Sequence, residues 1–447
     1  IYNSDRRIRK VLHSASALQG RVTHFIHNTS RIVVLPPGSE SMVSTVKTEG
    51  GEEFIMLESE AIAAYGGWML VVQQSHFLSA LAGAVARISV PGQGAEKEKY
   101  EEWKPGDLDD FNTFRMIGEG DTTGVYLLES RGIRDLLTTI RPRGFDDLVN
   151  VISLYRPAPL EGRLWQKYVE NAGREGKVYL PHNSLAGPLE VTRGLLLYGE
   201  QVREILLQTA GLTAQDAAFV ERALGRKDAS DLQSARLTFI RGAMERDIGE
   251  EDSQKIFDFL LHNIEFTFDK AFSCTQAYIS YRSAYLKAHH PAEYFAALLD
   301  SSADVRDRKK RYLDYLELKG PKVFLPDVNY SGRGFIAENG AIRAPMQEAC
   351  DITAEEVETV LAERESGLFE SLDDFLERLS GRLSMETVMN MAGCGIFDSF
   401  GYGRKVLREE VQAFYDEHAR AGEFFRAPAE SSRPKKSDDG QLSLFDD

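Results

Sequence analysis

The stretch FDKAFSCTQAYISYRSAYLKAHHPAEYFAALL, at residues 268–299, carries a continuous helical pattern that a single proline interrupts. Its tyrosines Tyr278, Tyr281 and Tyr285 recur at intervals of three and four residues, which places them on one face of a helix. Because proline cannot continue a helix, Pro291 should end the first helix and open a second. This part of the chain is therefore predicted to be a helical core.

The helical pattern extends upstream of this stretch and changes near residue 110. From Phe111 to about Ser301, apolar residues recur at helical spacing almost throughout. Earlier in the chain the pattern is mixed, and a helical stretch at 76–88 follows short runs of β-branched and aromatic residues. The predicted strands are residues 31–35, 53–57 and 68–72. A polar segment rich in Gly, Lys and Glu, 91–110, should be an exposed linker.

Downstream of the helical region, the pattern becomes mixed again. Residues 322–335 predict strands and turns, and three short helices follow. These helices should begin at Thr353, Ser371 and Ser384, and the third should end near Gly393 and Gly395. Thr353 and Glu356 have the spacing of a capping box. Beyond Arg426 the polar composition predicts a disordered tail, although the tail ends in an apolar cluster.

The composition is that of a globular chain of 447 residues, long enough for about two to four packing units. Hydrophobic residues are 43% and charged residues 27%, which excludes a fibrous or wholly disordered chain. The net charge of −16 excludes a uniformly basic nucleic-acid coat but leaves room for local basic patches. Three cysteines without a CxxC pair argue against a disulfide framework and a structural zinc site.

No apolar run is long enough to span a membrane, and no signal peptide opens the chain, so we expect a cytoplasmic protein without a membrane partner. The chain begins at Ile1 and not at Met, which leaves open that it is part of a longer polypeptide.

General motifs give no complete active site. Asp107, Asp109 and Asp110 are the densest carboxylates that a catalytic metal would need, but in a polar linker they are expected to be solvated. His289 and His290 stand at a helix end without a partner at metal-ligand spacing, and we expect them to cap the helix or lie on the surface. The residues alone therefore predict no catalytic residue and no metal ligand.

The basic residues are more informative. Arg222 and Arg226 lie four residues apart and share a helix face, with Lys227 adjacent, while Lys270 stands at the start of the tyrosine-bearing helix. Cationic groups near a helix N-terminus suit a triphosphate or a nucleic-acid backbone. The alternative is that the arginines pair with surface carboxylates and that the tyrosines belong to the core.

Six strings in this chain resemble motifs of bacterial DNA polymerase III alpha subunits, the C-family replicative polymerases. They are 120–130 (GDTTGVYLLES), 154–160 (LYRPAPL), 189–202 (LEVTRGLLLYGEQV), 222–227 (RALGRK), 268–298 and 325–331 (LPDVNYS). They keep the order that they have in the family and spread over most of residues 10–405. The chain is identified as a divergent member of that family, similar to its C-terminal palm, fingers and clamp-binding portion.

The resemblance implies an α+β fold with a mixed palm remnant, mostly helical fingers, a small helix-hairpin-helix clamp-side domain and a disordered tail. The implied domains are the C-terminal part of the palm at 1–105, the fingers at 106–305, the helix-hairpin-helix and clamp-binding domain at 306–405, and a helix followed by the tail at 406–447. In the family, palm aspartates hold the metal ions for attack of a primer 3′-hydroxyl on the nucleotide α-phosphate. Primer-template DNA and other replisome subunits are the implied partners.

The resemblance also implies a set of nucleotide- and DNA-binding residues in the fingers, where the family grips the incoming nucleotide and the template. The positions that match the basic residues of its motifs are Arg156, Arg222, Arg226, Lys227 and Lys270.

The palm of this chain departs from the family at a metal ligand. The family's KFDFLGL-like segment falls on residues 69–75, and its metal-binding Asp falls on Val71, which cannot ligate a metal. No Asp lies between Tyr65 and Glu96, so a small shift of the alignment does not restore the ligand. The other two palm aspartates would lie upstream of Ile1. Mg²⁺ is therefore the cofactor expected only if the chain is active, and none of its ligands is identified.

The fingers and the first helix-hairpin-helix depart as well. Lys270 is retained, but Phe272 and Gln276 replace a His and a Tyr of the family. Glu221 replaces an Arg and places a negative charge where a triphosphate would sit. Residues 349–352 (ACDI) replace the GVG whose backbone N–H groups bind phosphates. The apolar framework is kept while ligand-facing positions change, which indicates a chain retained for its shape.

The C-terminal tail ends in a pentapeptide that resembles the bacterial sliding-clamp-binding sequence QLxLF. Three apolar side chains would fill a pocket on the clamp while an amide hydrogen-bonds at its rim. The predicted clamp-binding residues are Gln441, Leu442, Leu444 and Phe445.

Three hypotheses follow. The first is a catalytically degenerate alpha-subunit relative that acts in DNA replication or repair on the sliding clamp. The second is an active DNA-directed DNA polymerase whose metal ligands lie upstream of Ile1, or are carboxylates outside the alignment such as Glu58 or Glu60. The third is a scaffold that does not touch DNA, and its behaviour toward DNA would not depend on salt.

Overall fold

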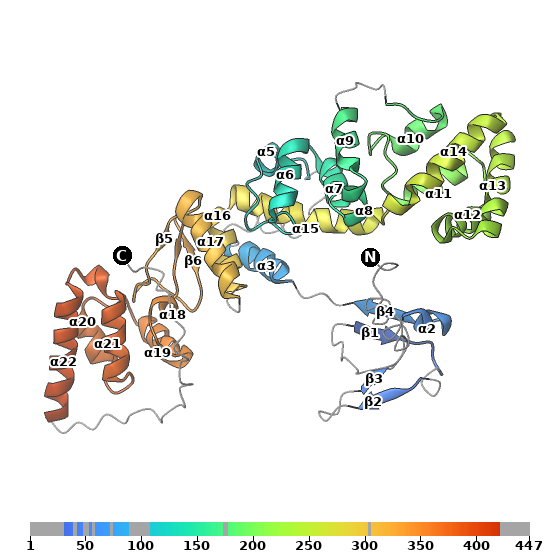
Figure 1. Ribbon diagram of the computed structural model, residues 1–447. Helices are drawn as coiled ribbons and strands as arrows, with labels where there is room; N and C mark the ends of the chain where they lie inside the picture. The colour runs from blue at the N-terminus through green and yellow to red at the C-terminus, as the bar shows by residue number, and fades with distance from the viewer. Residues whose placement is uncertain are drawn as a thin grey trace, which may run out of the picture. The chain divides into compact units, whose positions relative to one another are not determined.

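The computed structural model describes residues 31–38, 43–47, 53–55, 59–71, 75–88, 108–172, 178–302 and 305–420. These residues belong to two compact units, Ile1–Ser75 and His76–Asp447 (Figure 1). Most of the predicted linker at 91–110, together with Asp107 and the C-terminal pentapeptide, lies outside the described residues. The predicted four-part division into palm, fingers, clamp-side domain and tail remains a prediction.

The first unit contains two small antiparallel sheets and one short helix. Strand β1 (Arg31–Val34) pairs with β4 (Trp68–Val71), and β2 (Thr45–Lys47) pairs with β3 (Glu53–Ile55). Helix α2 (Ser59–Ala64) precedes β4. The predicted strands at 31–35, 53–57 and 68–72 correspond to β1, β3 and β4, whereas β2 was not predicted.

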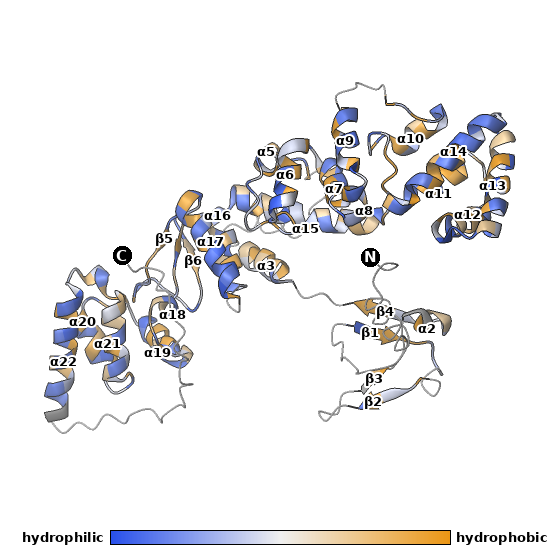
Figure 2. Cartoon of the chain, viewed as in Figure 1, coloured by the Kyte–Doolittle hydropathy of each residue, from blue (hydrophilic) through white to orange (hydrophobic). Residues whose placement is uncertain are grey.

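Helix α3 (His76–Ile88) belongs to the second unit, although the predicted palm domain at 1–105 included it. It packs on α16 (Pro291–Asp300), and its buried residues share one apolar core with that helix. Small residues allow the two helices to approach closely, because a Cβ on Gly83 would lie 3.2 Å from the Cβ of Ala297. Figure 2 shows α3 as largely hydrophobic.

The region between residues 108 and 302 is helical in its described parts, as the sequence predicts. Its helices are α5 (Phe111–Gly118), α6 (Arg131–Ile140), α7 (Phe145–Leu154), α8 (Pro157–Glu161), α9 (Leu164–Ala172), η3 (Asn183–Leu185), α10 (Ala186–Leu189), α11 (Gly199–Gln208), α12 (Ala214–Arg226), α13 (Ala229–Met244), α14 (Glu250–Asn263), η4 (Ile264–Phe266), α15 (Lys270–His289) and α16. Pro291 is the first residue of α16, as predicted.

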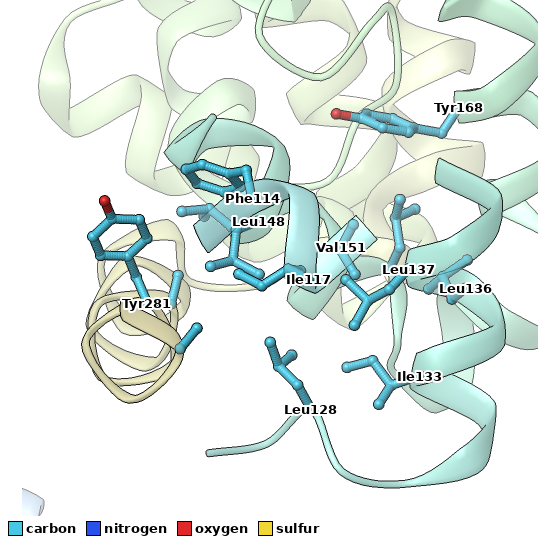
Figure 3. Packing of buried hydrophobic residues seen from close by; sticks show 14 of the residues in the cluster. Phe114, Ile117, Leu128, Ile133, Leu136, Leu137, Leu148, Val151, Tyr168 and Tyr281 are labelled. Atoms are coloured by element: carbon cyan, nitrogen blue, oxygen red, sulfur yellow. The ribbon is translucent and has the colours of Figure 1, made fainter. Parts of the chain in front are cut away.

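The tyrosine stripe of α15 is part of the apolar core, which was the alternative to a binding role. Tyr281 is fully buried, and Tyr278 and Tyr285 are partly buried against the same cluster. Figure 3 shows Phe114 and Leu148 converging beside the helix that carries Tyr281. These tyrosines therefore hold α15 in place beneath α5 and α7.

The motif at 120–130 is also structural in this fold, because a buried lysine fastens it to α15. Lys287 Nζ donates to the Asp121 backbone oxygen at 2.8 Å, to Asp121 Oδ1 at 2.9 Å and to the Thr123 backbone oxygen at 3.0 Å. Burial lowers the pKa of Lys287 to about 8, against the opposing effect of Asp121. The Tyr294 hydroxyl donates to the Gly124 backbone oxygen at 2.6 Å and fixes the same loop to α16.

The C-terminal part of the second unit combines a small sheet with short helices. Its elements are α17 (Arg306–Lys319), β5 (Val323–Phe324), β6 (Ile336–Glu338), β7 (Ala341–Arg343), α18 (Met346–Ala349), α19 (Ala354–Arg364), α20 (Leu372–Leu379), α21 (Met385–Cys394), η5 (Asp398–Phe400) and α22 (Arg404–Arg420). β5 pairs in parallel with β7, which pairs antiparallel with β6. The predicted capping box of Thr353 and Glu356 is confirmed at the start of α19.

The molecule is therefore an α+β protein with mostly helical architecture and small sheets, as predicted. Across the described residues, no helix has both the length and the apolar character that a bilayer crossing requires.

Candidate nucleotide and nucleic-acid interface

Phe268 ties the start of α15 to the start of α11. Its N–H donates to the Leu197 oxygen at 2.9 Å, and its own oxygen accepts from the Gly199 N–H at 3.0 Å. These bonds form a parallel bridge between Phe268 and Tyr198. The bridge brings two of the predicted basic residues, Arg156 and Lys270, to one place in the fold.

Arg156 precedes α8 and stacks on the ring of Phe268. Its guanidinium carbon lies 3.0 Å from the ring centroid, and burial lowers the pKa of the group. A cation on an aromatic face is held in position by the ring quadrupole. No carboxylate of the described chain pairs with Arg156, so its N–H groups are suited to a phosphate from outside the protein.

Lys270 opens α15, but the N-terminus of that helix already holds a carboxylate. Glu200 accepts from the Lys270 N–H at 2.8 and 3.0 Å and from the Ala271 N–H at 3.2 Å, while Asp269 caps the helix through the Phe272 N–H. The predicted phosphate position at this helix end is thus occupied by protein anions. What remains for a ligand is the Lys270 ammonium, 5.8 Å from the Tyr198 ring centroid.

Arg222 and Arg226 lie exposed on α12, and the described residues contain no carboxylate paired with either. The alternative that both pair with surface carboxylates is therefore not what the structure shows. Lys227 ends α12 in the left-handed conformation, and its ammonium lies 3.7 Å from a carboxylate oxygen of Glu265 in η4.

Glu221 does not leave a free negative charge beside Arg222. Both of its oxygens accept from Arg203 on α11, at 3.0 and 2.8 Å. The negative charge of Glu221 is therefore largely neutralised by Arg203 and repels a phosphate at this position less than the sequence alone suggested.

The fold brings together only part of the predicted basic set. Arg156 stacks on Phe268 and Lys270 lies near Tyr198, the two residues of one β-bridge, while Lys227 pairs with Glu265 in η4. Arg222 and Arg226 have no interaction with these three among the described residues. Glu200 is the functional neighbour that sequence reasoning missed, although it lies within the recognised string 189–202.

The described residues do not fit the Mg²⁺ that the resemblance implies. Val71 ends β4 opposite Arg31, with 56% of its surface exposed. Within the described ranges, no three His, Cys, Asp or Glu side chains gather as metal ligands. Asp110, one of the candidate carboxylates, instead caps α5 through the Thr113 N–H and lies 2.9 Å from His289 Nε2.

The helix pair α21 and α22 forms a basic groove that sequence reasoning did not single out. Its volume is about 700 Å³, and its lining includes Gly393, Arg404, Lys405 and Arg408. Acidic residues are also part of the wall, at Glu409 and Asp416. The signal that could have revealed this groove is a series of glycines, Gly393, Gly395, Gly401 and Gly403, that leads into Arg404-Lys405.

The hairpin between these helices is tightly organised. Gly395 ends α21 with a φ of 87°, a conformation that disfavours a side chain, and Arg404 bonds Asp398 at 2.8 Å across the turn. The matching hairpin between α18 and α19 carries Cys350 in a buried position. The groove beside the α21–α22 hairpin is lined by Arg404, Lys405 and Arg408.

Comparisons with known proteins match two parts of the chain, the helical region and the C-terminal hairpin region. The bacterial DNA polymerase III alpha subunit finger domain model matches residues 93–247, and a helix-hairpin-helix motif model matches residues 320–407. The DNA polymerase III subunit alpha of Thermus aquaticus is 31% identical over 90% of this chain and 33% of its own length. The chain is a divergent member of the DNA polymerase III alpha-subunit family.

Other alpha subunits show the same partial coverage. The Escherichia coli (strain K12) protein is 26% identical over 94% of this chain and 37% of its own length. The Haemophilus influenzae protein is 33% identical over 70% of this chain and 28% of its own length. The chain thus spans about a third of the length of these curated alpha subunits.

The matched ranges contain most of the basic residues. Arg156, Arg222, Arg226 and Lys227 fall within the finger-domain match, and Lys270 lies beyond it. The α21–α22 hairpin falls within the helix-hairpin-helix match.

Proposed function

We propose that this chain contacts primer-template DNA in replication or repair as a catalytically degenerate, sliding-clamp-tethered relative of the polymerase III alpha subunit. It would work in the cytoplasm beside other replisome subunits. The observation that carries the DNA contact is the α21–α22 groove, whose lining includes Arg404, Lys405, Arg408 and Gly393.

The chemistry of this groove suits a DNA backbone. A hairpin that ends in glycines allows close approach of a phosphate to backbone N–H groups, and the neighbouring cations neutralise its charge. Since Arg404 is already bonded to Asp398, Lys405 and Arg408 are the cations more available to a phosphate. Lys405 lies 3.9 Å from Glu409 with both side chains largely exposed, a pairing too weak to withhold it from DNA.

The finger region supports a second contact. The stacked Arg156 and the Lys270 ammonium flank the Phe268 bridge, and the exposed Arg222 and Arg226 add positive charge on α12. A backbone phosphate or the triphosphate of a nucleotide would fit this chemistry.

Catalytic degeneracy is proposed from the residue at the end of β4. Val71 stands where the family resemblance expects a metal-binding aspartate. The alternative function, an active DNA-directed polymerase with ligands upstream of Ile1, predicts Mg²⁺-dependent primer extension by a chain that includes those residues. We expect no nucleotide incorporation by the present chain with Mg²⁺ and dNTPs, with or without clamp, and incorporation would overturn the degenerate assignment.

The DNA contact is tested by fluorescence anisotropy of a labelled primer-template titrated with the chain at several salt concentrations. Loss of one phosphate contact should lower the slope of log K against log salt by about 0.9. We expect this change for Arg408→Ala and for Lys405→Ala. Arg333→Ala is the control, because Arg333 lies elsewhere in the C-terminal region and is paired with Glu358. Equal slopes in all four proteins, or no salt dependence at all, would favour the scaffold without DNA contact.

A further inference from the structure

Two cysteines, Cys350 at the end of α18 and Cys394 at the end of α21, belong to one apolar core. Cys350 lies in the turn between α18 and α19 and is 6% exposed, and Cys394 is the last residue of α21. Cys350 Sγ lies 4.0 Å from the Asn390 backbone oxygen, on the final turn of α21. Cys350 is buried in the same apolar core against which Cys394 packs, and the interaction between the two thiols is the main cause of a pKa shift at each of them.

Two arginines stand beside Cys394, one near each of its neighbours in sequence. A Cβ on Gly395 would lie 2.5 Å from an Arg404 Nη, and a Cβ on Gly393 would lie 3.9 Å from the Arg408 guanidinium carbon. Cys394 itself is partly exposed, whereas Cys350 is buried. A thiol in positively charged and partly exposed surroundings is the type that reacts as a thiolate.

The two thiols differ in the state that their surroundings favour. The hydrogen bond from Cys350 lowers the pKa of Cys394 to about 7, with help from Arg404 and Arg408. The same hydrogen bond and burial raise the pKa of Cys350. One sulfur is thus prepared as the nucleophile, and the other keeps its proton beside it.

We propose that Cys394 is a peroxide-reactive thiolate and that Cys350 is its resolving thiol, so that oxidation links the two hairpins by a reversible disulfide. This modification site does not depend on DNA binding, because it rests only on the meeting of the two hairpins.

The chemistry balances with hydrogen peroxide as the oxidant. The Cys394 thiolate attacks one peroxide oxygen, the O–O bond breaks, and the products are a Cys394 sulfenic acid and hydroxide, which takes a proton to become water. The Cys350 sulfur then attacks the sulfenic sulfur. The S–S bond forms as the S–O bond breaks, and the leaving hydroxide takes the proton of Cys350 as a second water. Two thiols are oxidised, one peroxide is reduced, and a dithiol reductant restores the pair.

The third cysteine provides an internal control. Cys274 lies on α15 in the first apolar core, and burial raises its pKa. Lys270 lowers this pKa, but burial outweighs it, and the carboxylates of Asp146 and Glu200 also raise the pKa. The same peroxide should therefore leave Cys274 reduced.

The test is non-reducing peptide mapping of the whole chain after brief exposure to a small excess of hydrogen peroxide. We expect a linked peptide that contains Cys350 and Cys394, with the mass of the two peptides less two hydrogen atoms, and its loss on treatment with dithiothreitol. Cys274→Ser should keep the link, whereas Cys350→Ser should accumulate a Cys394 sulfenic acid that dimedone captures. Cys394→Ser should leave Cys350 unmodified.

Peptide mapping of the native chain alone is enough to test the proposal. Three free thiols after peroxide treatment, or a link that involves Cys274, would overturn the proposal. A Cys350 sulfenic acid in Cys394→Ser that forms as fast as the native link would reverse the assigned roles and overturn it as well. Thermal unfolding of each serine variant, compared with the native chain, establishes that its result comes from a folded protein.

Discussion

Lys287 holds a positive charge inside the protein, with only 3% of its side chain exposed. Replacing it by Met would leave the Asp121 carboxylate without its cation and two backbone oxygens without their donor. Removing one partner of a buried pair typically costs about 3–5 kcal/mol of unfolding free energy. We expect Lys287→Met to lower the urea midpoint accordingly.

A matched exposed lysine makes this result specific. Lys255 on α14 forms ion pairs with Glu251 and Asp252 at the surface. Lys255→Met should leave the urea midpoint almost unchanged, because exposed pairs are screened by water and salt. Equal effects of the two substitutions would mean that Lys287 does not fix the loop at 120–130.

The reactivity of Cys394 should follow its charge environment. Because the neighbouring Cys350, Arg404 and Arg408 lower the pKa of this thiol to about 7, its thiolate fraction should rise as the pH increases from 6 to 8. Burial raises the pKa of Cys274 above its usual value, so its thiolate forms only in alkaline solution. Iodoacetamide labelling followed by peptide mass mapping should show Cys394 modified first at pH 7. The same pH profile at both cysteines would contradict this prediction.

Single residues show where sequence reasoning succeeds and where it stops. The capping box of Thr353 and Glu356 is local, and it was predicted correctly from a spacing of three residues. Glu200 in α11 accepts from Lys270, 70 positions away at the start of α15, and Asp121 accepts from Lys287, 166 positions away. No local pattern encodes such pairs, so the occupied helix end and the buried ion pair became visible only in the fold.

Helix α3 shows that an element can be predicted correctly and still be assigned to another part of the molecule. Its period was clear, but its partner α16 lies more than two hundred residues downstream. Leu81 is 4% exposed in the shared core, whereas Leu78 on the same helix is 46% exposed. These two leucines therefore allow a matched test of the packing.

We expect Leu81→Ala to lower the unfolding free energy by about 2–5 kcal/mol, the usual cost of emptying a packed site. Leu78→Ala, in the same helix, should have a much smaller effect because little surface is buried there. Urea unfolding followed by tryptophan fluorescence and circular dichroism measures both. If the two variants unfold alike, α3 does not pack on α16 as described.

Element boundaries followed the sequence where a local signal marked them. Pro291 opens α16, and Ser371 and Ser384 cap α20 and α21 as their positions predicted. The functional meaning of the elements was harder to predict. The tyrosines of α15 belong to the core, and the cations beside the α21–α22 hairpin became notable only once Gly393 and Arg408 lined one groove.

At the scale of the whole molecule, the net charge of −16 works against DNA binding. Basic side chains line local sites such as the α21–α22 groove, while the overall field repels a polyanion. A tether to a clamp that already encircles DNA would raise the local concentration of the chain and offset this repulsion. The predicted clamp-binding residues would then bring the chain to DNA, which its net charge of −16 opposes.

The clamp tether is tested with variants of the C-terminal pentapeptide in the full chain. Phe445→Ala removes the largest apolar side chain of the predicted motif, and we expect the affinity for purified sliding clamp to fall by at least tenfold, since buried aromatic anchors dominate such contacts. Ser443→Ala is the matched control, because the position between the two leucines is variable in QLxLF. Isothermal titration calorimetry of clamp against each protein gives the comparison. Unchanged affinity for Phe445→Ala would exclude the pentapeptide as the tether, and DNA recruitment would then have to come from the basic sites alone.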